Sequence, residues 1–233
     1  MKAIAIALVA LLDASSAAWA AAPVQAEAKD IVTARFGISQ PLEKVEGQGT
    51  ELNGGSGMVF GADYIRKVLP RLGLGLEYSY VQRQGRDSAA LVSGALSKVS
   101  GEDHLILAMA KWFILPQSLF QPYVGAGVGV GISRLKVVSE PAVGFPWTAT
   151  GTTDGRTVVD STDTGFAFGL RGGADAALTK GLSIGAELGY TRVGGLNYPL
   201  TGPGQQVLPG LSGFKAASGS YHFAGRLVYR FQG

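Results

Sequence analysis

Serine and histidine are the first residues to weigh for chemistry, because the chain contains no cysteine and only two histidines, His104 and His222. Ser220 and His222 stand two residues apart, a spacing that places both side chains on one face of a β-strand. Such a pair suggests a nucleophile and its general base. Asp103 beside His104 suggests a metal ligand pair, but no further histidine stands near it to complete a site. We expect no catalytic residue, metal or cofactor, and we interpret His222 as a solvated residue in a non-enzymatic protein.

A glycine-rich run offers a second chemical hypothesis. The stretch "QPYVGAGVGVGIS" (121–133) places Gly125, Gly127, Gly129 and Gly131 at every second position. A dinucleotide-binding loop needs the spacing G-x-G-x-x-G and then a helix, and neither follows here. Strict alternation with β-branched residues instead predicts a strand with one apolar face and one nearly bare face.

Composition narrows the class of protein. Of the 233 residues, 46% are hydrophobic, only 16% are charged and 35 are glycine. The net charge of +3 is modest, and the basic residues are dispersed rather than clustered, so we expect no nucleic-acid binding. The absence of cysteine excludes disulfides and thiolate metal sites.

The N-terminus carries an export signal. A positive start at Met1-Lys2, an apolar run from Ala3 to Leu12 and an A-x-A motif ending at Ala20 are typical of a signal peptide. We predict a signal peptide over residues 1–20, with cleavage after Ala22 as the alternative, and a short periplasmic segment over residues 21–29. No later segment has about 18 uninterrupted apolar residues, so we expect no helix that spans the inner membrane.

From residue 30 to residue 231 the sequence predicts one all-β domain. Eight segments alternate with a period of two, and they cover residues 31–39, 57–65, 71–81, 103–114, 121–133, 165–178, 182–191 and 220–231. The connections alternate in length as well. We predict short periplasmic turns at 66–70, 115–120 and 178–181 and long extracellular loops at 40–53, 82–101, 138–162 and 194–218. Alternating short and long connections are typical of an antiparallel up-and-down transmembrane barrel.

The two faces of these segments differ in size as well as polarity. One face carries large apolar and aromatic side chains, and the other carries glycine, serine and scattered charges. An eight-stranded barrel has room inside only for packed side chains, so the bulky face is predicted to meet lipid and the small face to line the lumen. Arginine at Leu74 or Val128 should therefore impair assembly, and arginine at Ser79 should be tolerated better. Aromatic residues near strand ends are predicted to form girdles at the membrane interfaces; these are Tyr64, Tyr80, Trp112, Tyr123, Tyr190, Tyr221, Tyr229 and Phe231.

Two stretches resemble a known family, the small eight-stranded outer-membrane barrels of the OmpA/OmpX type and the opacity-type surface antigens. "AKWFILPQSLFQPYVGAGVGVG" (110–131) is similar to a strand-turn-strand of that family, and "FAGRLVYRF" (223–231) is similar to its last strand. The resemblance implies that the last strand is the signal for the outer-membrane assembly machinery, at positions that match Phe223, Leu227, Tyr229 and Phe231. Here the chain continues for two residues, Gln232 and Gly233.

Charged residues on the small face are predicted to form a hydrogen-bonded network that plugs the lumen. Its members are Arg35, Asp63, Glu77, Lys111, Arg171, Asp175, Glu187 and Arg226. Counting back from a loop with Gly194 opposite Gly219 places Glu187 opposite Arg226, in a register that could slip by two residues. Arg171 is expected within a diagonal step of Glu187, and Glu77 is expected near Lys111.

These observations leave several functions open. We expect a monomer in the cell outer membrane, among outer-membrane lipids and lipopolysaccharide, with a structural, surface-antigen or adhesin-like, or narrow porin-like role. A host or surface ligand would bind the long loops, and in one of them Phe145 and Trp147 would pack on the barrel rim or contact a partner. The alternatives are a lipid-modifying enzyme similar to lipid A deacylases and a carrier of small hydrophobic molecules. A carrier needs an apolar lumen mouth, and the glycine- and charge-lined face argues against one.

Overall fold

The structure is a computed structural model of the chain. It describes residues 29–41, 45–47, 50–52, 55–87, 96–116, 118–140, 156–202, 205 and 212–231. The expected signal peptide, nearly all of the expected periplasmic segment, Phe145, Trp147 and the two C-terminal residues lie outside these ranges. In the part of the chain that the structure describes, no helix combines the length and the hydropathy needed to cross a membrane.

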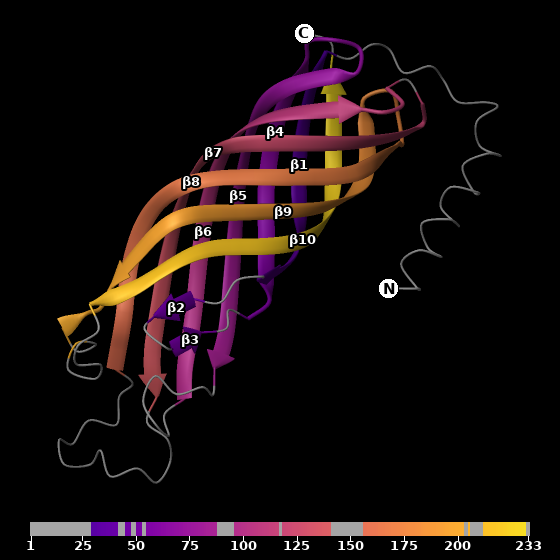
Figure 1. Ribbon diagram of the computed structural model, residues 1–233. Coiled ribbons are helices and arrows are strands. Elements are labelled where there is room, and N and C mark those ends of the chain that lie inside the picture. The colour runs from indigo at the N-terminus through magenta and orange to yellow at the C-terminus, as the bar shows by residue number, and fades with distance from the viewer. Residues whose placement is uncertain are drawn as a thin grey trace.

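Eight long strands close into one antiparallel barrel (Figure 1). Neighbours in the sequence pair with each other, and β1 closes the barrel by pairing with β10 from Asp30 opposite Phe231 to Pro41 opposite Ser220. The long strands are β1 (Asp30–Pro41), β4 (Gly57–Lys67), β5 (Leu72–Asp87), β6 (Leu96–Phe113), β7 (Phe120–Glu140), β8 (Arg156–Ala177), β9 (Leu182–Pro199) and β10 (Gly213–Phe231). The predicted eight-stranded barrel, with short turns at one end and long connections at the other, is confirmed.

Two very short strands are added to this barrel. The strands β2 (Val45–Gly47) and β3 (Thr50–Leu52) form a hairpin within the first long connection. The hairpin joins the sheet where Glu46 lies opposite Lys215 of β10. Figure 1 shows it beside β10, at the end of the barrel away from the C-terminus.

The alternation of the faces is inverted relative to a soluble protein. Large apolar side chains point outward and are exposed, for example Leu76 at 61%, Phe166 at 62% and Leu188 at 62%. Charged side chains such as Glu77 and Lys111 point inward and are buried. An antiparallel strand can present one face to each environment, and here the apolar face is the one suited to lipid.

The strands on the long-connection side extend further than the sequence predicts. β5 continues to Asp87, β6 begins at Leu96, β8 begins at Arg156 and β9 continues to Pro199. β7 likewise continues to Glu140 and β10 begins at Gly213, so the predicted loop boundaries at 82, 101, 138, 162, 194 and 218 are wrong. Polar and glycine residues weaken the strand signal in these stretches, but pairing between neighbouring strands continues to extend them.

These extensions give the outer part of the lumen an apolar lining that the sequence interpretation missed. Inward-facing side chains from β6 to β10 pack there and are buried; they are Val99, Leu135, Val137, Val158, Val159, Leu196, Tyr198 and Phe214. The expectation that glycine and charge line the whole interior is therefore wrong for this part of the barrel. All of these side chains are nearly inaccessible, so the lining is packed rather than open.

The glycines of β7 lie opposite long inward-facing side chains of β6. Gly125 lies opposite Lys111, Gly127 opposite Met109 and Gly129 opposite Leu107. A Cβ atom at position 127 would collide with the sulfur of Met109. The strand β6 is apolar on both faces. The alternating glycines of β7 therefore leave room inside a narrow barrel for the inward-facing side chains of β6.

The outward position predicted for the aromatic residues is confirmed for most of them and is wrong for one. Tyr64, Trp112, Tyr221 and Tyr229 are each more than 40% exposed on the outer wall. Tyr123 instead points into the lumen and is only 2% exposed. It lies on the same face of β7 as the glycines, so the period of two already placed it inside.

Candidate functional site

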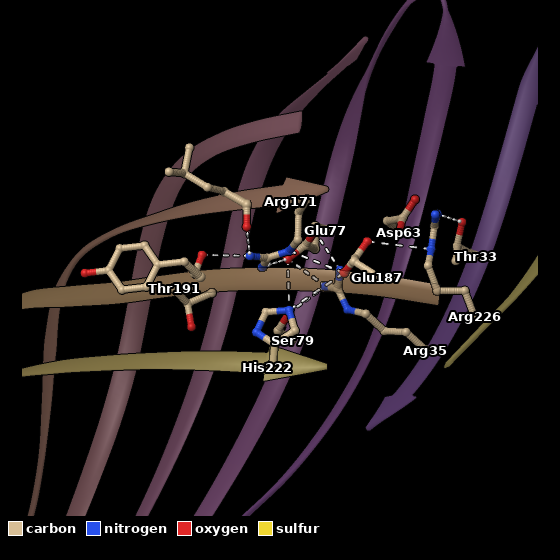
Figure 2. Close-up of polar contacts among 12 residues, drawn as sticks. Thr33, Arg35, Asp63, Glu77, Ser79, Arg171, Glu187, Thr191, His222 and Arg226 are labelled. Carbon is tan, nitrogen blue, oxygen red and sulfur yellow. Dashed lines mark hydrogen bonds and ion pairs between the residues drawn. The ribbon is translucent and has the colours of Figure 1, made fainter. Parts of the chain in front are cut away.

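Arg35, Glu77, Arg171 and Glu187 form a cluster of charges inside the barrel (Figure 2). Arg35 of β1 binds Glu77 of β5 through two contacts, Nη1 to Oε2 at 2.9 Å and Nη2 to Oε1 at 2.6 Å. Arg35 Nη1 also donates to Glu187 Oε1 of β9 at 3.1 Å. Arg171 of β8 donates to Glu77 Oε1 and lies 3.6 Å from Glu187 through its Nε. Contacts between β1, β5, β8 and β9 cross the lumen, because these strands are not all neighbours in the sheet.

Neighbouring polar side chains and a backbone carbonyl make further hydrogen bonds with this cluster. Ser79 accepts a hydrogen bond from Arg35 at 2.6 Å and donates to Glu77 Oε1 at 3.1 Å. Arg171 Nη1 donates to the Tyr190 carbonyl at 2.9 Å. Tyr123 donates its hydroxyl hydrogen to Glu187 Oε2 at 2.6 Å. The two carboxylates of the cluster therefore accept several charge-assisted hydrogen bonds, which are stronger than neutral ones.

A second group of charges lies nearer the short turns. Arg226 of β10 donates to Asp175 of β8 at 2.9 Å and to Thr33 of β1 at 3.2 Å. Arg230 donates to the other oxygen of Asp175 at 3.3 Å and also to Ser183. The Arg226 guanidinium lies over the Tyr123 ring at 4.4 Å from its centroid, and its Nε lies 3.6 Å from Glu187. Tyr123 and Glu187 thus connect this group to the central cluster.

Lys111 and Asp63 form a further buried pair beside these groups. Lys111 Nζ of β6 lies 3.0 Å from Asp63 Oδ2 of β4, with both side chains at most 1% exposed. The same ammonium lies 5.3 Å from the centroid of Tyr123. All eight charged residues selected from the sequence are therefore buried in the lumen, and each makes an ion pair with another of the eight.

Two of the expected pairings are wrong in detail. Arg226 lies opposite Gly185 and Glu187 lies opposite Ala224, so the register is displaced by two residues from the pairing of Glu187 with Arg226. The starting pair of the count is the source of the error, because Gly219 lies opposite Arg192 rather than opposite Gly194. Lys111 pairs with Asp63 rather than with Glu77, because Glu77 lies opposite Leu107 and Lys111 opposite Gly73.

Arg171 and Glu187 lie a diagonal step apart, as expected. Arg171 is opposite Gly189 and Glu187 is opposite Gly173. These glycines have a common role, because a side chain at either would collide with the network. A Cβ at position 189 would overlap the His222 ring, and one at position 173 would lie 2.6 Å from the Tyr123 hydroxyl.

The sequence interpretation did not select several residues that take part in the network. Tyr123, Ser79, Thr33, Ser183 and Arg230 all contribute hydrogen bonds to it. Each occupies an inward position of its strand, so strand parity was the signal that could have identified them. Parity alone says which side chains share the lumen, but it does not say which of them touch.

His222 is buried against this network rather than solvated. Its side chain is 1% exposed, and its Nε2 lies 3.7 Å from Glu187 Oε1, which is longer than a hydrogen bond. Ser220 instead shares a hydrogen bond with Thr191 at 3.1 Å. Within the described part of the chain, neither ring nitrogen of His222 has a hydrogen-bond partner, so no contact joins Ser220 to it as a nucleophile to a base.

The other chemical hypothesis involves Asp103 and His104, which lie on opposite faces of β6. His104 lies on the outer wall, where its Nδ1 is 2.8 Å from the Tyr78 hydroxyl and its ring contacts Tyr80. Asp103 points inward and is buried. Among the described residues, no group of three or more histidine, aspartate or glutamate side chains could hold a metal ion.

Asp103 is the centre of a second polar cluster, which the sequence interpretation missed. Its carboxylate accepts hydrogen bonds from Arg83 of β5 and Ser218 of β10, each at 2.6 Å, and from Ser133 of β7. Tyr198 of β9 donates to Ser133 at 2.7 Å. Because β5 and β10 lie on different sides of the barrel, this cluster crosses the lumen a second time, on the long-connection side of the charge network.

The residues expected to carry the assembly signal lie in one row on the outer face of β10. Phe223, Leu227 and Tyr229 are 53–56% exposed, and Phe231 is 36% exposed. This row borders the seam at which β10 pairs with β1. Recognition of the row by an assembly machinery stays a prediction.

Comparisons with known proteins agree with this architecture. Residues 4–231 match the family model described as the outer membrane protein beta-barrel domain. No curated protein sequence matches the chain. Among solved structures, the outer membrane protein OprG of Pseudomonas aeruginosa is 16% identical with a TM-score of 0.53, over 91% of this chain and 100% of that chain. Neisserial surface protein A is 15% identical with a TM-score of 0.47, over 87% and 97% of the two chains.

At such low identity the likeness to OprG shows the fold alone. The match to the family model shows the family as well as the fold, because it covers nearly the whole chain, including all eight long strands of the barrel. The protein therefore belongs to the outer membrane protein beta-barrel domain family, and it is a protein of the outer membrane.

Proposed function

We propose that this protein is a closed, non-conducting outer-membrane barrel whose role is structural and surface-presenting rather than catalytic. The observation that supports the proposal is the charge network, whose ion pairs connect β1, β5, β8 and β9 across the lumen. The side chains of Arg35, Glu77, Arg171 and Glu187 are all 0% exposed. An ion that entered the lumen would have to displace hydrogen bonds that have no replacement in this environment.

The parts of the barrel beyond the membrane fit a surface-presenting role. About ten tilted residues span the apolar band of such a barrel, whereas β6 to β10 each have 18–22 residues. The additional strand residues extend the barrel wall beyond the membrane. This part of the barrel has a packed apolar interior, and the long connections begin and end at its edge. An adhesin-like or antigenic surface requires such a support for its loops.

Single-channel recording in a planar bilayer tests the closed barrel. We expect no resolvable steps from the wild-type protein in concentrated KCl, with insertion verified by a protease-protected barrel fragment from the same preparation. The matched variant removes one cation and one carboxylate together, Arg35→Ala with Glu187→Ala, which keeps the net charge and takes away contacts across the lumen. Steps from this variant alone would identify the network as the barrier. Ohmic steps from the wild type would reject the proposal in favour of a narrow pore.

A carrier of small hydrophobic molecules is the second candidate, and the apolar outer lumen favours it. The side chains of Val137, Leu196 and Phe214 line this part of the barrel. They are packed in the structure, so a carrier would have to loosen them. Titration of the reconstituted protein with an apolar fluorescent probe separates the two roles. One-to-one saturable binding that Leu196→Asp abolishes would support the carrier, and unsaturable partitioning equal to that of protein-free vesicles would exclude it.

A further inference from the structure

His222 is a buried titratable side chain that has no hydrogen bond in the closed barrel. Its side chain is 1% exposed, and neither ring nitrogen has a hydrogen-bond partner in the described part of the chain. On β1, Ser39 lies directly opposite His222, and its hydroxyl is likewise buried without a partner among the described residues. Buried polar groups are nearly always hydrogen-bonded, because an unpaired one is costly. An imidazole kept under these conditions is a candidate for a role in another state of the lumen.

The barrel nevertheless leaves room for an imidazole at this position. Gly189 of β9 lies opposite His222, and a Cβ atom at position 189 would overlap the ring. Figure 2 shows the imidazole extending from β10 toward the charge network. Its Nε2 lies 3.7 Å from Glu187 Oε1, just beyond hydrogen-bond distance. A small movement would therefore bring the ring into contact with this carboxylate.

The charged groups around His222 come from both neighbouring strands and from across the lumen. They are Glu187 of β9, Arg35 of β1, Arg171 of β8, Glu77 of β5, Arg226 of β10 itself and, toward the long connections, Asp103 of β6. Asp103 accepts a hydrogen bond from Ser218, which precedes His222 by four residues on the same inward face of β10. His222 thus lies between the two polar clusters that cross the lumen.

A protonated His222 would fit poorly into the closed arrangement. Five cationic side chains of the network already face four carboxylates, so the imidazolium would add a sixth cation. Arg35 and Arg171 repel a positive charge on the ring. Glu187 is the nearest carboxylate, but it already accepts hydrogen bonds from Arg35 and Tyr123. An imidazolium would therefore have to take Glu187 from one of these donors or be hydrated.

We propose that His222 is a proton sensor that couples the closure of the lumen to pH. The uncharged imidazole is compatible with the closed network. Acid favours a loosened state in which the protonated ring contacts Glu187 and water, because the imidazolium is more stable when hydrated than when buried beside two arginines. An imidazole ordinarily has a pKa of about 6.5, so at pH 5.5 the equilibrium shifts by at most about tenfold. This inference rests on the proposed function, namely a lumen that is closed at neutral pH.

A thiol at position 39 reports on the hydration of the lumen beside His222. The chain has no cysteine of its own, and Ser39→Cys removes no hydrogen bond recorded for that side chain. The full-length mature protein in vesicles carries Ser39→Cys alone or together with His222→Gln. Rates of reaction with methyl methanethiosulfonate, a small uncharged thiol reagent, are measured at pH 7.5 and at pH 5.5. Comparing the two proteins at one pH cancels the pH dependence of the thiol itself.

We expect both thiols to be protected at pH 7.5. At pH 5.5 the protein with His222 should react up to about tenfold faster than the protein with His222→Gln. Equal rates at pH 5.5, with protection at pH 7.5, would overturn the sensor and leave the closed lumen standing. Rapid reaction of Ser39→Cys at pH 7.5 would reject the closed lumen and the sensor with it.

The other histidine provides a matched control. His104 lies on the outer wall, so His104→Gln should leave the reaction rate at pH 5.5 unchanged, and a slowing equal to that of His222→Gln would overturn the proposal. If His222→Gln fails to fold, NMR of the untagged wild type replaces it, because its two histidines give two imidazole signals that His104→Gln assigns. On acidification the His222 signal should change together with the backbone amide signals of Glu187 and Gly189. A His222 signal that titrates while these amide signals stay fixed, or that is unchanged at pH 5, would contradict the sensor.

Discussion

At the scale of single residues, the lumen is governed by the cost of burying charge. Among the described residues of the network, the cationic side chains Arg35, Lys111, Arg171, Arg226 and Arg230 face the carboxylates Asp63, Glu77, Asp175 and Glu187. Buried ion pairs of this kind add little net stability, because desolvation offsets most of the attraction. Loss of one partner is costly, because it leaves the other charge uncompensated.

The pair of Arg226 with Asp175 gives a direct measurement of this coupling. We expect Arg226→Ala and Asp175→Ala each to lower the free energy of unfolding by about 3–5 kcal/mol. The double variant should lose less than the sum by about 0.5–3 kcal/mol. Urea titration of the reconstituted protein, followed by tryptophan fluorescence, measures all three changes. The exposed pair of Arg134 with Asp160 is the control and should couple by at most about 1 kcal/mol. Strictly additive losses at Arg226 and Asp175 would show that the two charges act independently.

At the scale of the strand, alternate side chains point to opposite faces, so one face of each strand meets lipid and the other lines the lumen. Val128 is 55% exposed on the outer wall of β7, and Gly127 and Gly129 beside it face packed side chains of β6. Ser79 of β5 shows the limit of the sequence argument. The polarity of its face predicts that arginine there is tolerated, but the side chain is buried and bonded to Arg35 and Glu77, so no room remains for a larger one.

The lipid-facing row of β7 can be tested with a matched pair of variants. Val128→Arg should lower the free energy of unfolding in vesicles by about 2–4 kcal/mol, because a cation near the bilayer midplane is poorly solvated. Gln82→Arg places the same side chain on the outer wall beyond the apolar rows, and it should cost about 0–1 kcal/mol. Folding yield and denaturant titration in vesicles of one lipid provide the comparison. Equal costs for the two variants would contradict the assignment of the wall to lipid.

At the scale of the whole molecule, the barrel has one short-turn end and one long-connection end, and its orientation is predicted from export. An N-terminus that remains in the periplasm after cleavage of the signal peptide places the short turns in the periplasm. The turn between β8 and β9, which contains Lys180, then lies on the periplasmic side, and the connection between β7 and β8 lies outside the cell.

Protease treatment of intact cells tests this orientation. Proteinase K, which has little sequence preference, should cut in the long connections, for example between β7 and β8. It should spare the turn at Lys180 until the outer membrane is permeabilised. Mass spectrometry of the fragments identifies the sites. Cleavage beside Lys180 in intact cells, with the long connections spared, would reverse the topology.

The amino-acid sequence alone was enough to predict the strand faces, the number of long strands and the eight charged residues that enter the lumen, because a period of two is a local property of extended backbone. Closure of the sheet could be predicted too, since unpaired strand edges are costly in hydrocarbon. Which charges meet became visible only in the folded barrel. The contacts of Glu77 with Arg171 and of Asp103 with Ser218 join strands that are distant in the sheet. The pairing of Gly219 with Arg192, rather than with Gly194, displaces Arg226 by two residues from the counted register. Such pairings depend on the tilt, register and diameter of the closed barrel, and no local pattern in the sequence carries them.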